Sequence, residues 1–341
     1  MKQVKIDVIG FGNVGQGLAT ILKDRGWEYA EQFGVQFQLM GIADALKGCV
    51  YDPRGLDVEQ VLRKVESDGS LRGLEAEKSG WDALTLIRES RADVVIELSY
   101  TNLTTGEPAA TYITEALRMK KHVVTTNKGP VALHYERLER LAHENGVQIG
   151  VEGTVMSGTP AIRIGRELLV GAGIQRVQGI LNGTTNYILT RMESGATYTE
   201  ALTEAQALGY AEADPTGDVE GFDAAGKVVI LARLLMGQSI SMADVDRKGI
   251  SHLTPSDIVS AHAAGERWKL IGSLVKENNR LAAKVQPTRI STAHPLAGVG
   301  GATNAITYTT DLLGDVTLIG PGAGRLATGY AVIEDLLAIY R

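Results

Sequence analysis

The sequence holds very little cysteine and few aromatic residues. Of its 341 residues one is cysteine, Cys49, and aromatic residues make up 5 %. A single cysteine excludes an intramolecular disulfide and a cysteine-based zinc cluster. No apolar run approaches the roughly 20 residues of a membrane span, and the N-terminus lacks the pattern of a signal peptide. These absences predict a cytoplasmic protein without a membrane partner.

Basic residues are outnumbered by acidic ones. Lys and Arg number 34, Asp and Glu number 40, and the net charge is −6. Because nucleic acid binding needs a basic surface, this balance argues against nucleic acid as the main partner. At roughly 150 residues per domain the length predicts two domains. The 40 glycines indicate many tight turns and sites lined by backbone.

Strands and helices alternate in the first part of the chain. Strands are predicted at 4–9, 36–43, 92–98 and 122–126, helices at 16–33 and 108–119, and loosely placed short helices within 52–80. This alternation predicts an α/β fold with a Rossmann-type, doubly wound parallel sheet.

After about residue 150 the pattern changes. Helices are predicted at 162–170, 199–208 and 222–236, β-type patterning at 281–319, and an amphipathic helix at 325–339. We therefore expect an inserted α+β domain over about 136–317. The C-terminal helix would return to a first domain made of residues 1–135 and about 318–341.

A glycine-rich loop follows the first predicted strand. Gly10, Gly12 and Gly15 fit the G-x-G-x-x-G pattern, with Asn13 and Val14 between them. In a dinucleotide fold these glycines permit a tight turn, close approach of the pyrophosphate and close helix–strand packing. The helix N-terminus faces the phosphates. The loop therefore predicts NAD or NADP binding, and a plain turn is the alternative.

Asp44, at the end of the second predicted strand, could bind the cofactor's ribose. It follows the glycine loop at more than the usual ~20 residues, which fits a long first helix. A carboxylate there would accept from the ribose 2′-hydroxyl and favour NAD. Lys47 and Arg54 could instead hold the 2′-phosphate of NADP, and Asp44 could be a turn residue, so the cofactor preference stays open.

Lys128 lies just after a predicted parallel strand, in the run Thr-Asn-Lys-Gly-Pro at 126–130. Ligands of doubly wound sheets bind at this carboxyl edge. A lysine there can hold a carboxylate or polarise a carbonyl, and a solvated surface lysine is the alternative.

An acid-rich loop precedes a strongly apolar predicted helix. Its acids are Glu212, Asp214, Asp218, Glu220 and Asp223. Lys227 lies one helical turn after Asp223, where its ammonium could donate to a substrate oxygen, although an ordinary surface ion pair fits the same spacing. The acids match no EF-hand pattern, so a divalent cation site is the less favoured interpretation.

A glycine- and threonine-rich run, Gly-Thr-Thr-Asn-Tyr at 183–187, offers backbone amides and hydroxyls to a small polar ligand. A turn with capping threonines is an equal alternative.

Together these motifs resemble those of homoserine dehydrogenase over essentially the full length of the chain. The matching segments are residues 10–15, 126–130, 152–155, 180–188, 208–215, 218–227 and 320–324. The Asn-Gly-Thr-Thr-Asn-Tyr run at 182–187 and the Tyr-x-Glu-x-Asp-Pro segment at 210–215 are highly specific.

The resemblance implies an NAD(P)-dependent oxidoreductase that interconverts L-aspartate 4-semialdehyde and L-homoserine in threonine and methionine biosynthesis. It implies proton transfer by Lys227, with Asp223 as its partner acid and Lys128 as a second lysine at the substrate. The implied substrate contacts are Gly183, Thr184, Tyr210, Glu212 and Asp218. The implied cofactor contacts are Gly10, Gly12, Asn13, Val14, Gly15, Asp44, Ser99, Lys128 and Gly322.

The resemblance also implies a structural sodium ion, held largely by backbone carbonyls at Glu152, Val155, Ser157 and Thr159. Met156 and Ser157 stand where many relatives have small residues or glycine. A homodimer assembled through the inserted domain is expected. Since the chain stops at Arg341, we expect neither the regulatory domain nor the fused kinase of longer family members, and no threonine feedback through such a domain.

Two rival functions are weighed against this one. A phosphorylating semialdehyde dehydrogenase needs a nucleophilic cysteine, and Cys49 lies outside the segments that carry the other motifs. A dinucleotide sensor without turnover would not need the two lysines or the acid-rich loop. Turnover of homoserine with NAD or NADP separates the sensor from the enzyme.

Overall fold

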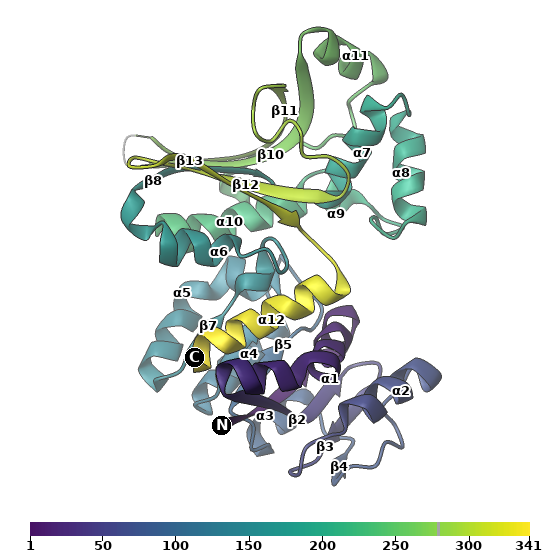
Figure 1. Ribbon diagram of the computed structural model, residues 1–341, viewed down its shortest axis with the longest axis vertical. Helices are drawn as coiled ribbons and strands as arrows, with labels where there is room; N and C mark the ends of the chain where they lie inside the picture. The colour runs from purple at the N-terminus through teal and green to yellow at the C-terminus, as the bar shows by residue number, and fades with distance from the viewer. Residues whose placement is uncertain (278–279) are drawn as a thin grey trace. The chain divides into compact units, whose positions relative to one another are not determined.

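The computed structural model describes residues 1–277 and 280–341 and divides into two compact units (Figure 1). The first comprises Met1–Gly158 and Gly324–Arg341, and the second comprises Thr159–Ala323. The predicted boundary after residue 135 falls inside helix α5 (Lys128–Asn145), which lies in the first unit. The boundary near 318 falls inside strand β13 (Gly314–Pro321), which belongs to the second unit.

The first unit is built on a seven-stranded sheet in the order β4-β3-β2-β1-β5-β6-β7. The strands are β1 (Lys2–Ile9), β2 (Val35–Asp44), β3 (Gly48–Tyr51), β4 (Lys78–Ser79), β5 (Val94–Glu97), β6 (His122–Thr125) and β7 (Ile149–Gly150). Strands β2, β1, β5, β6 and β7 run parallel, whereas β3 pairs antiparallel with β2 and β4. The sheet confirms the predicted doubly wound fold. Its strand order reverses between β1 and β5, where ligands of such sheets bind.

Helices of the first unit connect these strands. They are α1 (Asn13–Phe33), α2 (Val58–Asp68), α3 (Ala83–Glu89), α4 (Ala109–Arg118), α5 and α12 (Arg325–Tyr340). Helix α1 starts three residues before the prediction and ends at Phe33, the predicted last residue. Helix α2 ends at Gly69, whose φ of +64° suits glycine. Among residues 1–277 and 280–341, no helix has both the length and the hydropathy needed to span a membrane.

Helices α1 and α12 lie side by side in the first unit, purple and yellow in Figure 1, and approach closely at two glycines. A Cβ on Gly17 would overlap the carbonyl oxygen of Arg325, and one on Gly329 would lie 2.7 Å from the backbone nitrogen of Leu18. The returning C-terminal helix therefore packs backbone to backbone against the helix that follows the glycine loop.

Substituting Gly17→Ala is expected to lower the free energy of unfolding by about 1–3 kcal/mol, because the added methyl forces α12 away from α1. Urea unfolding of the variant measures this loss. Gly26→Ala in the same helix is the matched control, since its Cβ would meet no atom within 4 Å. Alanine there should stabilise the helix by about 0.5–1 kcal/mol. Equal effects of the two substitutions would contradict the packing argument.

The second unit is built on a six-stranded sheet in the order β13-β12-β8-β10-β11-β9. Its strands are β8 (Ile174–Ile180), β9 (Val245–Arg247), β10 (Glu266–Glu277), β11 (Arg280–Ser291), β12 (Thr303–Thr310) and β13. All neighbours pair antiparallel except β9 and β11. Its helices are α6 (Ala161–Arg163), α7 (Gly183–Glu193), α8 (Tyr198–Ala207), α9 (Thr216–Val219), α10 (Phe222–Met236) and α11 (Pro255–Ala263).

Several elements of the second unit differ from the prediction. The helix expected at 162–170 is a short α6 followed by a π-helical turn at Ile164–Leu168. The run at 183–187 is the first half of helix α7 and not an isolated turn. Strands β8 and β10 and helix α11 are not among the predicted elements. Helix α10 has the bounds predicted for it.

Candidate functional site

The glycine loop between β1 and α1 has the geometry that a pyrophosphate needs. Gly10 has a φ of +91°, and a Cβ there would lie 2.5 Å from the carbonyl oxygen of Leu98. A Cβ on Gly15 would lie 2.8 Å from the carbonyl oxygen of Gly10. Gly12 is the N-cap of α1, has no side-chain cap, and faces open space. The first N–H groups of α1, from Asn13 and Val14 onward, therefore lack a capping side chain.

A cavity of about 900 Å³ adjoins this loop. Its lining includes Gly10, Gly12, Asp44, Lys47, Arg72 and Ser99, all from the first unit. The open helix N-terminus and the roomy cavity fit a dinucleotide.

Asp44 forms part of the cavity wall and is tied to the glycine loop. Its Oδ2 accepts the N–H of Phe11 at 2.7 Å, and its Oδ1 accepts the N–H groups of Leu46 and Lys47 at 2.9 Å each. Burial opposes ionisation, but these donors and the Lys47 ammonium hold the pKa of the Asp44 carboxyl below its usual value. Asp44 is therefore a fixed anion and not a free turn residue.

The cations near this cavity differ from those expected. Lys47 lines it, but the Arg54 guanidinium binds the carboxylate of Asp52 at 2.8 and 3.0 Å and is absent from the lining. Arg72, which the sequence analysis missed, lines the cavity instead. Cys49 also lines it, but the cysteine is buried, and burial raises the pKa of its thiol to about 12. A thiol in that state is a poor nucleophile at neutral pH.

A buried carboxylate organises the carboxyl ends of β5 and β6. Glu97 accepts the backbone N–H of Ser99 at 2.8 Å and the hydroxyl of Thr125 at 3.0 Å. Burial raises the pKa of Glu97, against the hydrogen bonds that favour its charged form. The Asn127 amide donates to the carbonyls of Ser99 and Tyr100 at 3.1 and 3.2 Å. These bonds bring Ser99 to the start of α5.

Lys128 is the first residue of α5 and is half-buried. Asn127 caps this helix by accepting the N–H of Gly129 at 3.2 Å. The predicted cofactor contact Ser99 and the predicted ligand-binding lysine Lys128 thus share one hydrogen-bonded edge of the first unit.

In the second unit, Lys227 belongs to helix α10, and its side chain contacts the residue that follows β8. Its ammonium donates to the carbonyl oxygen of Leu181 at 2.6 Å and to Oδ2 of Asp223 at 2.7 Å. Lys227 is 6 % exposed, so this is not a solvated surface pair. An ammonium has three N–H donors, and the two bonds use two of them. Lys227 and Asp223 were predicted as a pair, and the contact confirms the pairing.

Asn182 joins this pair to Asp218. Its amide donates to Oδ1 of Asp218 at 2.7 Å and to Oδ2 of Asp223 at 3.0 Å, while its oxygen caps α7 by accepting the N–H of Thr185 at 2.9 Å. Burial and the neighbouring charge of Asp223 raise the pKa of Asp218. Asn182 carries no role in the sequence analysis. An asparagine directly before Gly-Thr-Thr, followed by apolar residues, is the N-cap signal that identifies it.

The segment after α8 contacts the first residues of α7. The Thr184 hydroxyl donates to the carbonyl oxygen of Tyr210 at 2.5 Å, and the rings of Tyr187 and Tyr210 lie 5.0 Å apart. The predicted residues Gly183, Thr184, Tyr210 and Asp218 are thus brought together. Glu212 follows on the loop with an exposed side chain, and its backbone carbonyl accepts from Gln206.

The acid-rich loop does not form a compact metal cluster. Glu212 and Asp214 are exposed, whereas Asp218 and Asp223 bind Asn182. Within the part of the chain that the structure describes, no group of three or more His, Cys, Asp or Glu side chains could hold a metal ion.

The residues implied for sodium flank, in the sequence, the point where the first unit ends at Gly158 and the second begins at Thr159. Glu152 is buried, and its N–H donates to Asp335 at 2.9 Å. Ser157 has a φ of +53°, a region that favours glycine, and its hydroxyl lies 2.7 Å from that of Thr328. The Thr159 carbonyl accepts the N–H of Ala161 at 2.7 Å. Val155 is buried between these positions in the sequence.

Comparisons with known proteins agree over the whole chain. Residues 160–337 match the family model described as homoserine dehydrogenase, and residues 10–152 match the model described as homoserine dehydrogenase, NAD binding domain. The chain is 43 % identical to an NAD(+)-dependent homoserine dehydrogenase of Pseudomonas canavaninivorans, over 100 % of this chain and 97 % of that protein. It is 40 % identical to a homoserine dehydrogenase of Methanocaldococcus jannaschii, over 98 % of each.

Solved structures give the same result. A homoserine dehydrogenase from Thiobacillus denitrificans superposes with a TM-score of 0.85 at 34 % identity, covering 100 % of this chain and 74 % of that one. A hyperthermophilic archaeal homoserine dehydrogenase mutant in complex with NADPH superposes with a TM-score of 0.85 at 32 % identity, covering 99 % and 97 %. With its doubly wound NAD(P)-binding sheet and its buried lysine–aspartate pair, the chain belongs to the homoserine dehydrogenase family of NAD(P)-dependent oxidoreductases.

Proposed function

We propose that the chain interconverts L-aspartate 4-semialdehyde and L-homoserine, with Lys227 as the residue that transfers the proton. The observation that carries the proposal is the buried ammonium of Lys227, fixed by Leu181 and Asp223. When bound, the nicotinamide supplies or accepts the hydride. In the direction of reduction, negative charge develops on the aldehyde oxygen, and the remaining N–H of Lys227 neutralises it by donating a proton.

The surroundings of Lys227 suit an amino-acid substrate. Asp218 and Glu212 would attract the substrate ammonium, while Gly183, Thr184 and Tyr210 would supply further contacts around it. Lys128, from the first unit, would bind the substrate carboxylate or the cofactor. Asp223 would keep Lys227 oriented through its 2.7 Å contact.

Cofactor binding is proposed at the cavity of the first unit. Gly10, Gly12, Asn13, Val14 and Gly15 would hold the pyrophosphate. Asp44 would accept from the 2′-hydroxyl of NAD, and Lys47 and Arg72 would bind the 2′-phosphate of NADP. A cavity wall with one fixed carboxylate and two cations supports use of both cofactors.

Replacing both Lys47 and Arg72 by alanine is expected to lower kcat/KM for NADP by about a hundredfold or more, since each charged hydrogen bond to phosphate contributes about 1.5–3 kcal/mol. The value for NAD should change less than about threefold, because its ribose carries no phosphate. Steady-state kinetics with each cofactor measure both effects. Arg54→Ala is the control, since Arg54 binds Asp52 and does not line the cavity. A similar loss with NAD and NADP would contradict these roles.

Three further features stay proposals. A sodium ion at the carbonyls of Glu152, Val155, Ser157 and Thr159 would have a structural role, and the left-handed backbone at Ser157 supports an unusual local geometry. A homodimer formed through the second unit and a cytoplasmic location rest on the family resemblance and the sequence. Light scattering of the purified protein measures the oligomeric state.

The test of the proposed function is the rate of NADH and NADPH formation with L-homoserine. We expect turnover with at least one cofactor. Binding of a cofactor without any turnover of homoserine would overturn the proposed enzymatic function and favour a dinucleotide sensor.

A further inference from the structure

The turn at residues 220–222 joins α9 to α10 and separates two carboxylates of the proposed site. Asp218 is the third residue of α9, Asp223 is the second residue of α10, and the Asn182 amide donates to both. In the middle of the turn, Gly221 has a φ of +79°, a conformation that suits glycine. The conformation of this turn therefore sets how the two carboxylates lie relative to each other.

Arg247, the last residue of β9, contacts all three residues of the turn. Its guanidinium donates to the carbonyl oxygen of Glu220 and lies over the ring of Phe222, 3.6 Å from the ring centroid. Its aliphatic stem lies beside Gly221, where a Cβ would come 3.6 Å from Cγ and 3.9 Å from Cδ of Arg247. A guanidinium over an aromatic face gains cation–π attraction. One side chain thus holds three consecutive residues.

The backbone of Arg247 is itself anchored within the second unit. Arg247 pairs with Val285 of β11, whose side chain is fully buried. The N–H of Lys248 donates to the carbonyl oxygen of Val285 at 2.8 Å, and the N–H of Ile250 donates to that of Val219, in α9, at 2.8 Å. Arg247 therefore reaches the turn from a strand that is fixed on both sides.

The hydrogen bonds of the proposed site depend on where this turn lies. The Asn182 amide reaches Asp218 at 2.7 Å and Asp223 at 3.0 Å. The same Oδ2 of Asp223 accepts from the Lys227 ammonium at 2.7 Å. A shift of the turn by about 1 Å would take these distances out of the range of a hydrogen bond. Holding the turn therefore keeps the Lys227 ammonium in its direction.

We propose that Arg247 is a positioning residue for the reaction: by fixing the turn at 220–222 it keeps Asp223 where it orients Lys227. This inference rests on the proposed function. Arg247 acts through Asp223 and exchanges no proton itself. Removing its guanidinium should therefore lower kcat, while cofactor binding in the cavity of the first unit should stay unchanged.

Arg247→Met is the first test, because methionine keeps part of the stem beside Gly221 and removes the guanidinium. We expect kcat for homoserine oxidation to fall about tenfold, a part of the roughly hundredfold that a misplacement of about 1 Å can cost. Arg247→Lys keeps a charged donor, so it should bring kcat back to within about threefold of the wild type. Steady-state kinetics of the full chain, below the melting temperature of each variant, measure both effects.

The same substitution in a Lys227→Ala chain separates positioning from a general structural role. With no ammonium left to orient, Arg247→Met should change the residual kcat by less than about twofold. A tenfold loss in both chains would overturn the proposal, because a general disturbance of the fold acts whether or not Lys227 is present.

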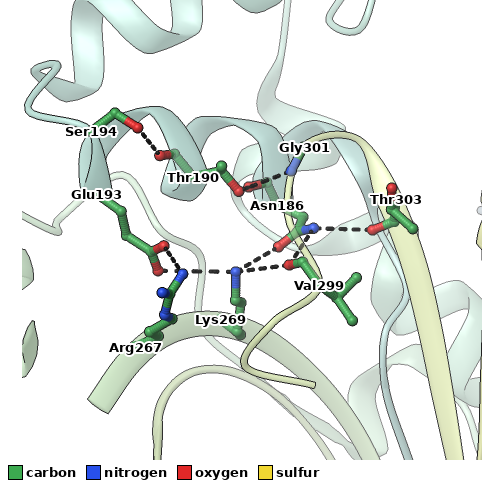
Figure 2. A network of polar contacts seen from close by, with 9 residues as sticks. All are labelled: Asn186, Thr190, Glu193, Ser194, Arg267, Lys269, Val299, Gly301 and Thr303. Atoms are coloured by element: carbon green, nitrogen blue, oxygen red, sulfur yellow. Dashed lines mark hydrogen bonds and ion pairs between the residues drawn. The ribbon is translucent and has the colours of Figure 1, made fainter. Parts of the chain in front are cut away.

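Arg267→Met is the matched control. Arg267 is another half-buried arginine of the second unit, and it donates to Glu193 at 3.0 Å in the network of Figure 2. Its loss also removes a charged hydrogen bond, so the melting temperature should fall as in Arg247→Met. Because Arg267 shares no partner with the turn, kcat should stay within about twofold. An equal fall of kcat in the two variants would contradict the proposed role of Arg247.

Hydrogen exchange followed by mass spectrometry tests the turn without any turnover. The N–H of Gly221 donates to the carbonyl oxygen of Asp218 at 2.9 Å, so its exchange reports opening of the turn. Exchange over residues 218–223 should be about tenfold faster in Arg247→Met, as for one lost charged hydrogen bond, and unchanged in Arg267→Met. Unchanged exchange in Arg247→Met would overturn the proposal. Faster exchange in a protein that never oxidises homoserine would leave Arg247 as the residue that fixes the turn and reject the proposed function alone.

Discussion

Substituting Lys227→Ala is expected to lower kcat for homoserine oxidation by about a thousandfold, within the range of 10²–10⁴ for loss of a positioned acid–base group. The ammonium is held at 2.6 Å from Leu181 and 2.7 Å from Asp223, so its direction is set before substrate binds. Water admitted into the space left by alanine has neither the charge nor the fixed position. Steady-state kinetics measure kcat, and calorimetry should find cofactor binding unchanged.

Lys269→Met provides the matched control for this variant. Lys269 is another buried lysine of the second unit, 1 % exposed and bound to Val299 and Asn186. Its replacement should reduce stability, with kcat staying within about threefold, since general destabilisation below the unfolding transition leaves the folded enzyme intact. If kcat survives in Lys227→Ala, the proton passes through Lys128 or water and the role of Lys227 is refuted.

A second large effect is expected at Asp7, in the central strand of the first unit. Asp7→Asn should raise the free energy of unfolding near pH 8 by up to about 4 kcal/mol, at 1.36 kcal/mol per pKa unit. Asp7 is fully buried, and its Oδ1 has no partner among the described residues. Burial raises the pKa of Asp7 to about 7, against the hydrogen bond from Ser90 and the charge of Lys121.

The direction with pH follows from the raised pKa. Well below pH 3.8 the carboxyl is protonated in both the folded and the unfolded chains, so Asp7 adds no pH dependence there. Between its ordinary pKa of 3.8 and about 7 only the unfolded chain releases the proton, and the folded state loses stability as pH rises. Asparagine stays neutral and removes this loss.

Urea unfolding near pH 5 and pH 8 measures the effect of Asp7→Asn. The free energy of unfolding of the Asp7→Asn variant should depend less on pH than that of the wild type. The gain in stability over the wild type should be larger near pH 8. Asp93→Asn is the control, because Asp93 is exposed and its Oδ2 accepts the backbone N–H of Lys5 at 2.8 Å. It should change stability by less than about 0.5 kcal/mol. A gain for Asp7→Asn that is equal at both pH values would disprove the explanation.

Local patterns predicted the first unit well because its signals are short and strong. Residues close together in the sequence suffice to identify three of its features. These are the β-branched strand before Gly10, the glycine spacing after it and the strand that ends at Asp44. Arg72 was missed because it reaches the cavity from a segment whose helices had no clear period. Nothing near Asp7 in sequence reveals that Ser90 and Lys121 are its polar neighbours.

In the second unit, the start of helix α7 could not be predicted because its first residues are glycine and threonine, which have low helix propensity. The run from Gly183 resembles a turn, yet Asn182 caps it and Ile188, Leu189 and Met192 bury its apolar face. Gly183 is required by the 2.6 Å approach of a Cβ to the Ala302 carbonyl, a contact between distant segments. The family motif identified Lys227 and Asp223 correctly as a pair, but the bridging amide of Asn182 became apparent only from the folded chain.

The first unit is formed by two separate segments of the chain, Met1–Gly158 and Gly324–Arg341, and this affects folding during synthesis. A ribosome delivers the chain from the N-terminus, so residues 159–323 emerge in full before α12 exists. Since domains generally fold as units, the later unit in sequence can be completed first. The Gly17 face of α1 stays uncovered until the last residues leave the exit tunnel. Nascent chains stalled before residue 325 should therefore expose an apolar surface that chaperones bind.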